Sequence, residues 1–352
     1  MAKLGGLVRI RTGSLDANAA VSDGKYPFFT CAALPLRIDR FSFDCECAVL
    51  SGNGGVNVSY YNGKFDAYQR TYVIESLDKQ RLSVPYLWCF LDWYAPALRQ
   101  KAKGGVIRYL RLADLTDAEI PLPDTAAQNR IAEKFLALKN AMECRREQLE
   151  LIPALRNARY RELFGGMRAE TTLGNLCRIV RGSSPRPIGK YLGGNVPWIR
   201  IGDADSGSIY LSRTAECITQ EGAAHSHRVL EGTVIFAACG VSLGFAKITA
   251  AEGCIHDGWL ALEDIAPELD KLFLVQSLSA RQEYFRRIAP AGTQPNLNTR
   301  IMSIQPQIVP PMDMQKKFAE FILETEDLSE YARHSLAELS AMKTAMQGQV
   351  FR

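Results

Sequence analysis

The feature that most constrains this chain is an internal repeat, because a chain that repeats itself builds similar units twice. Residues 125–164 match the segment 312–352 when the two are aligned at a separation of 187 positions. The identical or conservative pairs are Gln128/Gln315, Arg130/Lys317, Ala132/Ala319, Glu133/Glu320, Leu136/Leu323, Ala154/Ala341, Arg156/Lys343, Ala158/Ala345 and Phe164/Phe351. Chance gives one or two such matches, whereas a run in one register indicates an internal duplication.

Each repeated segment has the pattern of a long helix. Apolar residues recur in the first segment at the near-heptad spacing of a helix with one buried seam; they are Ile131, Phe135, Leu138, Met142, Leu149 and Ile152. Forty residues at about 1.5 Å each make a rod of about 60 Å. We expect Pro153 to kink or break this rod, because proline lacks the N–H that the helix ladder needs. A single rod cannot bury its own seam, so the second repeated segment is its expected partner.

The duplication also includes the segments that precede the two helices. Residues 4–14 read LGGLVRIRTGS and residues 173–183 read LGNLCRIVRGS, at a separation of 169. The second copy therefore carries 18 more residues between its opening and its helix. The two helices match residue for residue, whereas the domains before them share only their general plan. This contrast indicates a constant scaffold with two variable binding domains.

The segments between each opening and its long helix are rich in strand-like runs and turns. These runs are 25–32, 47–67 and 69–76 in the first copy and 197–203, 232–248 and 253–262 in the second. Asn62-Gly63 predicts a hairpin turn over residues 61–64, because Asn-Gly supplies the positive φ values of such turns. One short helix is predicted in each copy, over residues 84–101 and 269–288.

The sequence therefore predicts a mixed α/β (α+β) fold, in which two similar β-rich domains are joined by two long antiparallel helices. The predicted boundaries are 1–122 for the first domain, 123–166 for the first long helix, 167–310 for the second domain and 311–352 for the second long helix.

Composition indicates an ordinary globular protein of 352 residues, with 47% hydrophobic and 23% charged residues. The nine cysteines are scattered without a CxxC pair, which favours reduced thiols in a cytoplasmic protein over a disulfide framework. No run of 18 apolar residues occurs, so we expect no membrane anchor. The net charge of +4 is mildly basic and permits nucleic acid as a partner.

Motifs for catalysis or cofactor binding are weak. The glycine run at 52–57 lacks the third glycine of a dinucleotide fingerprint and precedes a strand-like run, so a turn explains it better. Cys45 and Cys47 form a CxC without a second metal-binding pair, and the HxH at 225–227 has no further ligand at suitable spacing. His256-Asp257 resembles part of a catalytic triad, although a loop pair is the simpler interpretation. We therefore predict no catalytic site, no metal and no cofactor.

Two basic loops favour nucleic-acid binding. From Arg99 to Arg111 the chain holds five basic residues and no acid. The corresponding loop at 291–302 has positive charge beside it, from Arg281, Arg286, Arg287 and Arg300 with Glu283 as the only acid. Lysine and arginine contact phosphates, and Asn, Gln, Ser, Thr and Arg side chains at loop tips contact base edges. The alternative is that such amides only cap turns. The second loop provides amides at Gln294, Asn296 and Asn298.

The layout as a whole resembles the specificity (S) subunit of type I restriction–modification systems. The resemblance rests on the two openings, the strand segment 51–74, PWIRIGD (197–203), GTQPNL (292–297) and the helices that follow IPLPDTAAQNRIAEKF and VPPMDMQKKFAEF. It covers nearly the whole chain, with both halves in the family's order. Two departures are the first loop, which reads GGVIRYLR in place of GTQPNL, and Cys239, where the family often has a more polar residue.

The resemblance implies two target-recognition domains, each of which binds one half of a split DNA sequence, on a chain that is not itself an enzyme. The implied partners are double-stranded DNA, DNA methyltransferase (M) subunits, expected in two copies, and restriction (R) subunits in systems that have them. S-adenosylmethionine would bind the methyltransferase, so no cofactor is expected on this chain.

Two other classes of function remain open. A duplicated coiled-coil adaptor would bind a protein or another non-DNA ligand, and an enzyme would use an unrecognised site around His256 and Asp257. If the chain binds DNA, the predicted DNA-binding residues are Ser14, Asn53, Tyr61, Asn62, Lys64, Gln69, Arg70, Lys101, Lys103, Arg108, Arg111, Ser183, Ser184, Arg186, Arg200, Asp203, Ser242, His256, Thr293, Gln294, Asn296 and Asn298.

Overall fold

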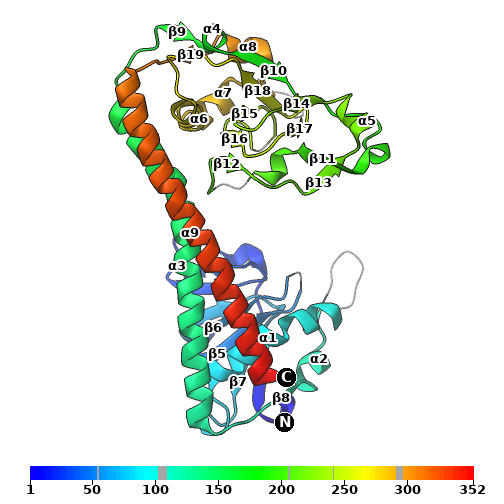
Figure 1. Cartoon of the computed structure of the whole chain (residues 1–352). Helices are drawn as coiled ribbons and strands as arrows, with labels where there is room; N and C mark the ends of the chain where they lie inside the picture. The colour runs from blue at the N-terminus through cyan, green and yellow to red at the C-terminus, as the bar shows by residue number, and fades with distance from the viewer. Residues whose placement is uncertain (54, 102–108, 205–206, 241, 291–295) are drawn as a thin grey trace. The chain divides into compact units, whose positions relative to one another are not determined.

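The structure is a computed structural model that describes residues 1–53, 55–101, 109–204, 207–240, 242–290 and 296–352 (Figure 1). The chain divides into two compact units. Unit 1 contains Met1–Glu143 and Ala337–Arg352, and unit 2 contains Cys144–Leu336. Each unit therefore combines a β-rich part with a section of both long helices.

The predicted pair of long helices is confirmed. Helices α3 (Thr125–Phe164) and α9 (Met312–Phe351) are each 40 residues long (Figure 1). Helix α3 continues through Pro153, so the proline does not break it. Most of the stability of such a helix comes from packing of its apolar face rather than from helix propensity.

In unit 2 the sections of α3 and α9 run antiparallel. Arg156 of α3 forms an ion pair with Glu326 of α9 at 3.0 Å. Two turns further along α3, Phe164 packs edge-on against Phe318 of α9, with ring centroids 5.3 Å apart. The residue number falls along α9 as it rises along α3, which is the predicted antiparallel arrangement.

Unit 1 is built on a six-stranded sheet of order β2-β7-β5-β6-β3-β4. The strands are β2 (Val8–Thr12), β3 (Tyr26–Phe29), β4 (Leu36–Ile38), β5 (Phe43–Ser51), β6 (Val58–Ala67) and β7 (Thr71–Ser76). The predicted short helix is confirmed as α1 (Val84–Lys101), whose apolar side chains fill the main core of this unit. Phe351 at the end of α9 packs against Tyr86 and Phe90 of α1, so α9 helps to close this core.

The predicted hairpin turn at residues 61–64 is wrong. Asn62 and Gly63 lie inside β6, where both pair with β5. The connection between β5 and β6 is formed instead by residues 52–57. Asn-Gly is a local turn signal, and the pairing register that buries the apolar residues of β5 and β6 overrides it. Gly63 keeps a positive φ of 134° within the strand.

Unit 2 contains a five-stranded sheet, β10-β18-β15-β16-β12, and a four-stranded sheet, β13-β11-β17-β14. The strands are β10 (Arg178–Arg181), β11 (Leu192–Ile199), β12 (Tyr210–Leu211), β13 (Glu216–Ile218), β14 (His227–Val229), β15 (Val234–Ala237), β16 (Ala246–Thr249), β17 (Gly253–Ile255) and β18 (Trp259–Glu263). All three predicted strand-like runs of the second copy therefore contribute strands to these sheets.

The single helix predicted over residues 269–288 is instead two helices, α6 (Lys271–Ser279) and α7 (Gln282–Ile288). At the break between them, the Arg281 guanidinium donates hydrogen bonds to the Pro306 carbonyl (2.6 Å) and the Gln307 side chain (2.8 Å). These tertiary contacts hold the break, and apolar periodicity along 269–288 does not reveal them.

The duplication is also visible in the smallest elements. In unit 1, β1 (Ala2–Lys3) pairs with β8 (Glu119–Ile120), and in unit 2, β9 (Thr171–Thr172) pairs with β19 (Pro306–Gln307). Each pair joins the opening of one copy to the segment before its long helix. Among the described residues, the other short α-helices are α2 (Leu112–Thr116), α4 (Leu173–Leu176), α5 (Gln220–Ala223) and α8 (Thr299–Ser303).

Candidate nucleic-acid interface

In unit 1 the end of β2, the end of β5 and the start of β7 meet at one edge of the sheet. The Gly52 N–H donates to the Arg70 carbonyl (2.7 Å), and the Leu110 N–H donates to the Gly52 carbonyl (2.9 Å). The segment that follows the first basic loop is thereby tied to this edge. Gly13 is required by close packing, because a Cβ there would lie 1.8 Å from the Ala67 carbonyl oxygen.

The side chains at this edge of unit 1 line a shallow pocket of about 400 Å³. The pocket is lined by Thr12, Gly52, Gln69, Arg70, Tyr72, Tyr109 and Leu110. The Gln69 amide donates to the Asp16 carboxylate at 2.6 Å, so its position is fixed although it is exposed.

Asn53 and Ser14 complete this edge. Asn53 forms an isolated backbone bridge with Tyr109, and its side-chain oxygen accepts a hydrogen bond from the Cys31 thiol. Ser14 is exposed and directly follows Gly13. The structure thus brings together four of the predicted residues in unit 1, namely Ser14, Asn53, Gln69 and Arg70.

An equivalent edge exists in unit 2, at the ends of β10 and β15 and the start of β18. The Gly182 N–H donates to the Trp259 carbonyl (3.0 Å), and the Leu297 N–H donates to the Ala238 carbonyl (2.8 Å). A Cβ at Gly182 would lie 2.3 Å from the His256 carbonyl oxygen, so glycine is again required. The glycine shared by the two openings therefore serves the same close approach in both units.

Asp257 organises the side chains at the edge of unit 2. Its carboxylate accepts a hydrogen bond from the Ser184 hydroxyl (3.1 Å), lies 3.5 Å from the Arg186 guanidinium and lies 2.9 Å from Nδ1 of His256. Together with Trp198 these residues line a groove of about 600 Å³. Three predicted residues, Ser184, Arg186 and His256, thus share one surface.

Ser183 and Asn296 lie beside this groove. The Ser183 hydroxyl donates to the His225 carbonyl (3.3 Å), and the Asn296 side-chain oxygen accepts a hydrogen bond from Arg181 (3.0 Å). Asn296 also forms an isolated backbone bridge with Cys239. Asn296 and the serines therefore flank the same strand end.

The two edges are built alike from equivalent positions. The bridge between Asn53 and Tyr109 in unit 1 corresponds to the bridge between Cys239 and Asn296 in unit 2. The corresponding side chains are Thr12 and Arg181, Asn53 and Cys239, Gln69 and Asp257, and Tyr109 and Asn296. One backbone arrangement thus carries different side chains in the two units.

Three predicted residues of unit 1 lie in β6. Asn62 and Lys64 are exposed, and the Lys64 ammonium lies over the Phe41 ring, 4.7 Å from its centroid. Tyr61 packs against Phe29 with ring centroids 5.4 Å apart. Asn62 and Lys64 are therefore open to solvent, whereas Tyr61 is partly buried against the core.

Two predicted basic residues, Lys101 and Arg111, flank the first loop, and each interacts with a neighbouring side chain. The hydrogen bond from the Lys101 ammonium to the Tyr94 hydroxyl (2.6 Å) raises the pKa of Lys101. Arg111 forms an ion pair with Asp114 at 3.1 Å, and the hydrogen bonds from Arg111 lower the pKa of that carboxyl. Both side chains remain cationic. The predicted residues outside the described part of the chain are Lys103, Arg108, Thr293 and Gln294.

Arg200, Asp203 and Asn298 stabilise local structure in unit 2. Arg200 forms an ion pair with Glu216 (3.1 Å), and its backbone N–H donates to the Asp203 carboxylate (2.8 Å). The Asn298 side chain accepts a hydrogen bond from the Ile301 N–H (2.8 Å) and caps α8. The sequence left two roles open for the Asn298 amide, base contact and turn capping. The structure shows that it caps a helix.

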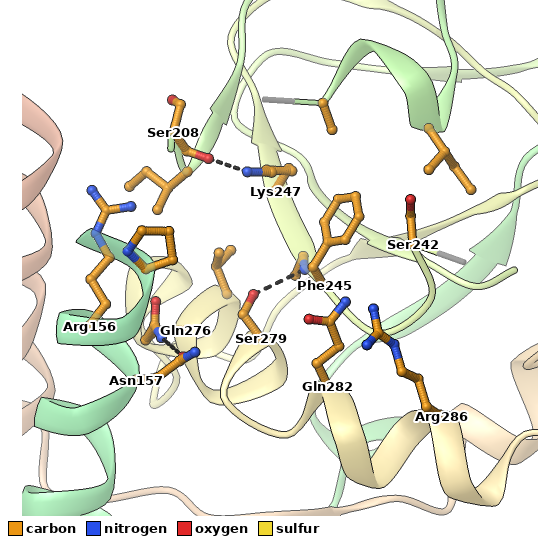
Figure 2. A pocket seen from close by; sticks show the side chains of 16 residues that line it. Arg156, Asn157, Ser208, Ser242, Phe245, Lys247, Gln276, Ser279, Gln282 and Arg286 are labelled. Carbon is orange, nitrogen blue, oxygen red and sulfur yellow. Dashed lines mark hydrogen bonds between the residues drawn. The ribbon is translucent and has the colours of Figure 1, made fainter. Parts of the chain in front are cut away.

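Ser242 lies at a different place, in a pocket of about 350 Å³ between α3, α6, α7 and β16 (Figure 2). In this pocket the Gln276 amide donates to Asn157 of α3 at 2.6 Å, and the Lys247 ammonium donates to the Ser208 carbonyl. The first contact joins α6 to the long helix α3, and the second joins β16 to the segment before β12. We interpret this pocket as a structural junction.

Within the described ranges, no three His, Cys, Asp or Glu side chains are grouped so that they could hold a metal ion. No helix in the same part of the chain is long and apolar enough to cross a membrane.

Sequence reasoning missed Arg181 and the equivalent Thr12. Both lie directly before the glycine that the two openings share, at a position where the aligned openings differ. The sequence therefore contained a signal for this position, namely a residue that differs between the two openings next to a glycine that they share.

The sequence matches a family model described as the type I restriction modification DNA specificity domain, over residues 1–154 and again over residues 169–341. The specificity subunit of the Escherichia coli type I restriction enzyme EcoDI is 40% identical to this chain over 171 residues. That match covers 48% of this chain and 38% of the relative, so it spans well under half of the relative's length.

Solved structures share the fold of the whole chain. The S subunit of the type I restriction–modification system from M. genitalium has a TM-score of 0.66 at 17% identity, with coverage of 100% of this chain and 95% of that chain. A protein from a study of complex assembly and conformational transition in the type I R-M system has a TM-score of 0.56 at 16% identity, with coverage of 100% and 97%. At these identities the likeness is one of fold, and it confirms the predicted mixed α/β architecture with long helices.

Proposed function

The chain belongs to the family of type I restriction–modification DNA specificity domains, and we propose that it is a subunit that recognises a bipartite DNA sequence. In this proposal each unit binds one half of a split target with its own sheet edge. The predicted boundaries at 1–122 and 167–310 are proposed for the two recognition domains. The family model matches once in each copy of the duplication, which supports two such domains in one chain.

The observation that carries this proposal is the pair of equivalent sheet edges with different side chains. In each unit a shared glycine, one isolated bridge and one strand end form the same backbone frame. The side chains on this frame differ: unit 1 presents Gln69 and Arg70, and unit 2 presents Ser184 and Arg186. Hydroxyls, amides and guanidinium groups are the groups that contact base edges and phosphates.

Two half-sites are also favoured by energetics. A correct base pair contributes roughly 1–3 kcal/mol to discrimination. Three or four base pairs per half therefore discriminate strongly when both halves bind the same DNA molecule, because the second binding step becomes intramolecular. The duplication supplies these two halves in one chain.

The proposed partners are double-stranded DNA, two methyltransferase (M) subunits and, in systems that contain one, a restriction (R) subunit. The partners would contribute the catalytic groups, with S-adenosylmethionine bound by the methyltransferase. The E. coli relative is a specificity subunit of a restriction enzyme by name, which supports a non-catalytic role for this chain. Cytoplasmic location remains a prediction from the cysteine pattern.

The test is a genome-wide methylation map of cells that express this chain with its methyltransferase, compared with cells that lack the chain. We expect a split motif, two short defined blocks around a fixed undefined gap, only when the chain is present. A continuous motif would contradict the assignment of one half-site to each unit. No motif, with both proteins folded and associated, would favour the duplicated adaptor.

A further inference from the structure

Arg181 occupies a fixed position at the edge of unit 2. It is the last residue of β10 and is half-buried. The following residue, Gly182, packs against the His256 carbonyl so closely that no side chain fits there. The backbone under Arg181 is therefore held in place by the strand pairing on one side and by this close contact on the other.

The guanidinium of Arg181 is also fixed. Its Nε–H donates to the Asp257 carbonyl at 3.0 Å, and a terminal nitrogen donates to the Asn296 side-chain oxygen at 3.0 Å. Two acceptors from separate segments define the plane of the group. A guanidinium carries five N–H donors, so these two bonds leave further donors for another ligand.

The acceptors of Arg181 are neutral, although a carboxylate is close. The Asp257 carboxylate interacts with Ser184, Arg186 and His256, and it is the Asp257 backbone carbonyl that holds Arg181. In the described part of the chain no ion pair to Arg181 forms. Its charge thus suits an electron-rich acceptor supplied from outside the protein.

We propose that Arg181 contacts a base edge and determines one base pair of the half-site that unit 2 binds. The chemistry fits guanine, whose O6 and N7 accept two hydrogen bonds from one arginine in the major groove. This inference rests on the proposed function and adds one specificity-determining residue to it.

The comparison of the two units favours a base contact over a phosphate contact. The position equivalent to Arg181 in unit 1 is Thr12, which is neutral and short. A charge-based phosphate contact built into the shared frame would place a cation in both units, and Thr12 provides none. A residue that changes character between two otherwise equivalent edges is instead suited to distinguishing base pairs.

The test compares Arg181→Ala and Arg181→Lys with the wild-type chain in complex with its methyltransferase. Arg178→Ala is the matched control: Arg178 lies in the same strand, is exposed and pairs with Glu263 (2.7 Å) and Asp264 (2.8 Å). The measurements are the genome-wide methylation motif and the affinity for duplexes that differ at single positions. Thermal unfolding shows whether each variant is folded. If Arg181→Ala is not folded, the test rests on Arg181→Lys.

We expect both Arg181 variants to relax one position in one block of the motif and to leave the other block unchanged. Lysine keeps the charge but not the two parallel donors, so discrimination at that position falls on the order of 10- to 100-fold in either variant. Arg178→Ala leaves the motif unchanged. A full wild-type motif in Arg181→Lys, or equal weakening for all duplexes, would overturn the inference. If the wild-type chain itself gives no split motif, the proposed function fails, and this outcome is distinct from a failure of Arg181 alone.

Discussion

Gln128 in unit 1 and Gln315 in unit 2 make the same three hydrogen bonds to equivalent partners. Both side chains are fully buried. The Gln128 oxygen accepts from the Ser83 N–H (2.9 Å), and its amide donates to the carbonyls of Arg81 (2.9 Å) and Pro123 (3.0 Å). The Gln315 oxygen accepts from the Asp270 N–H (2.9 Å), and its amide donates to the carbonyls of Glu268 (2.9 Å) and Pro310 (2.7 Å). Each glutamine thus fastens the first turn of a long helix to the segment before the short helix.

We predict that Gln128→Ala and Gln315→Ala destabilise the protein by similar amounts. Each change removes the glutamine side chain that binds one backbone N–H and two backbone carbonyls, so these buried groups lose a hydrogen-bond partner. Each unsatisfied buried group costs roughly 1–3 kcal/mol. Urea unfolding of the two variants measures the loss.

Gln148→Ala is the control for both glutamine variants, because Gln148 lies on the exposed face of α3. Surface substitutions of this kind usually change stability by no more than about 0.5 kcal/mol. If Gln148→Ala costs as much as Gln128→Ala, the buried hydrogen bonds are not the cause.

Gly13→Ala should destabilise unit 1, since the added methyl group would lie 1.8 Å from the Ala67 carbonyl oxygen. Relief of this clash requires movement of the backbone, and overpacking of this kind costs typically about 1–3 kcal/mol or more. Gly6→Ala in the same opening has nothing within 4 Å of the new methyl and serves as the control. Thermal unfolding of both variants decides the matter: equal melting temperatures would contradict the close approach at Gly13.

Glu326 should make the stability of unit 2 depend on pH. Burial alone would raise the pKa of this carboxyl, but the hydrogen bonds from Ser208 and the Ile209 N–H, together with Arg156, outweigh burial and lower it. A lowered folded-state pKa means that Glu326 stabilises the fold above the ordinary value of about 4.3. This contribution is lost as the pH falls through the folded-state pKa.

Glu326→Gln removes the charge and leaves Arg156 buried, since Arg156 is only 3% exposed. Breaking a buried pair in this way costs roughly 3–5 kcal/mol at neutral pH, and the acid limb of the stability curve becomes flatter. Glu162→Gln is the control, because Glu162 is exposed and the side chain of its partner Arg159 is 43% exposed. Solvent-exposed pairs of this kind contribute about 0–1 kcal/mol. Denaturant unfolding over a range of pH compares the two variants. An acid limb in Glu326→Gln that is as steep as in the wild type would assign the pH dependence to other groups.

The helices were largely predictable from the sequence, because long apolar periodicity is a strong signal. The helix predicted over 84–101 and the observed α1 have the same bounds, and α3 spans the predicted segment. Local signals failed where tertiary contacts decide the outcome. Asn62-Gly63 lies within a strand because the register of β5 and β6 prevails, and the break at Arg281 is held by contacts to residues 306–307.

The candidate site was only partly predictable, for a similar reason. Serines and asparagines near the openings could be named from the sequence, but their neighbours could not. Thr12 and Tyr109 line one pocket although 97 positions separate them in the chain. Such proximity depends on strand order, which the sequence pattern did not give. The amide at Asn298 illustrates the converse, because the structure uses it as a helix cap.

The two units should determine the two half-sites independently. Gln69 lies at the edge of unit 1, where its amide is held by Asp16 at 2.6 Å, and Gln294 belongs to the loop of the second copy, outside the described residues. We predict that Gln69→Ala relaxes one block of the methylation motif and Gln294→Ala relaxes the other. Loss of a base contact costs roughly 1–3 kcal/mol at the affected position.

Because Gln69 and Gln294 belong to different units, their effects should add in the double variant, as is usual for independent sites. The measurement is the methylation motif together with the affinity for duplexes altered in one half or the other. Gln148→Ala, on the exposed face of α3, is expected to leave both blocks unchanged. Uniform weakening at both half-sites in either single variant would mean that the glutamine contacts the DNA backbone or supports folding, and the assignment of that residue to one half-site would be wrong.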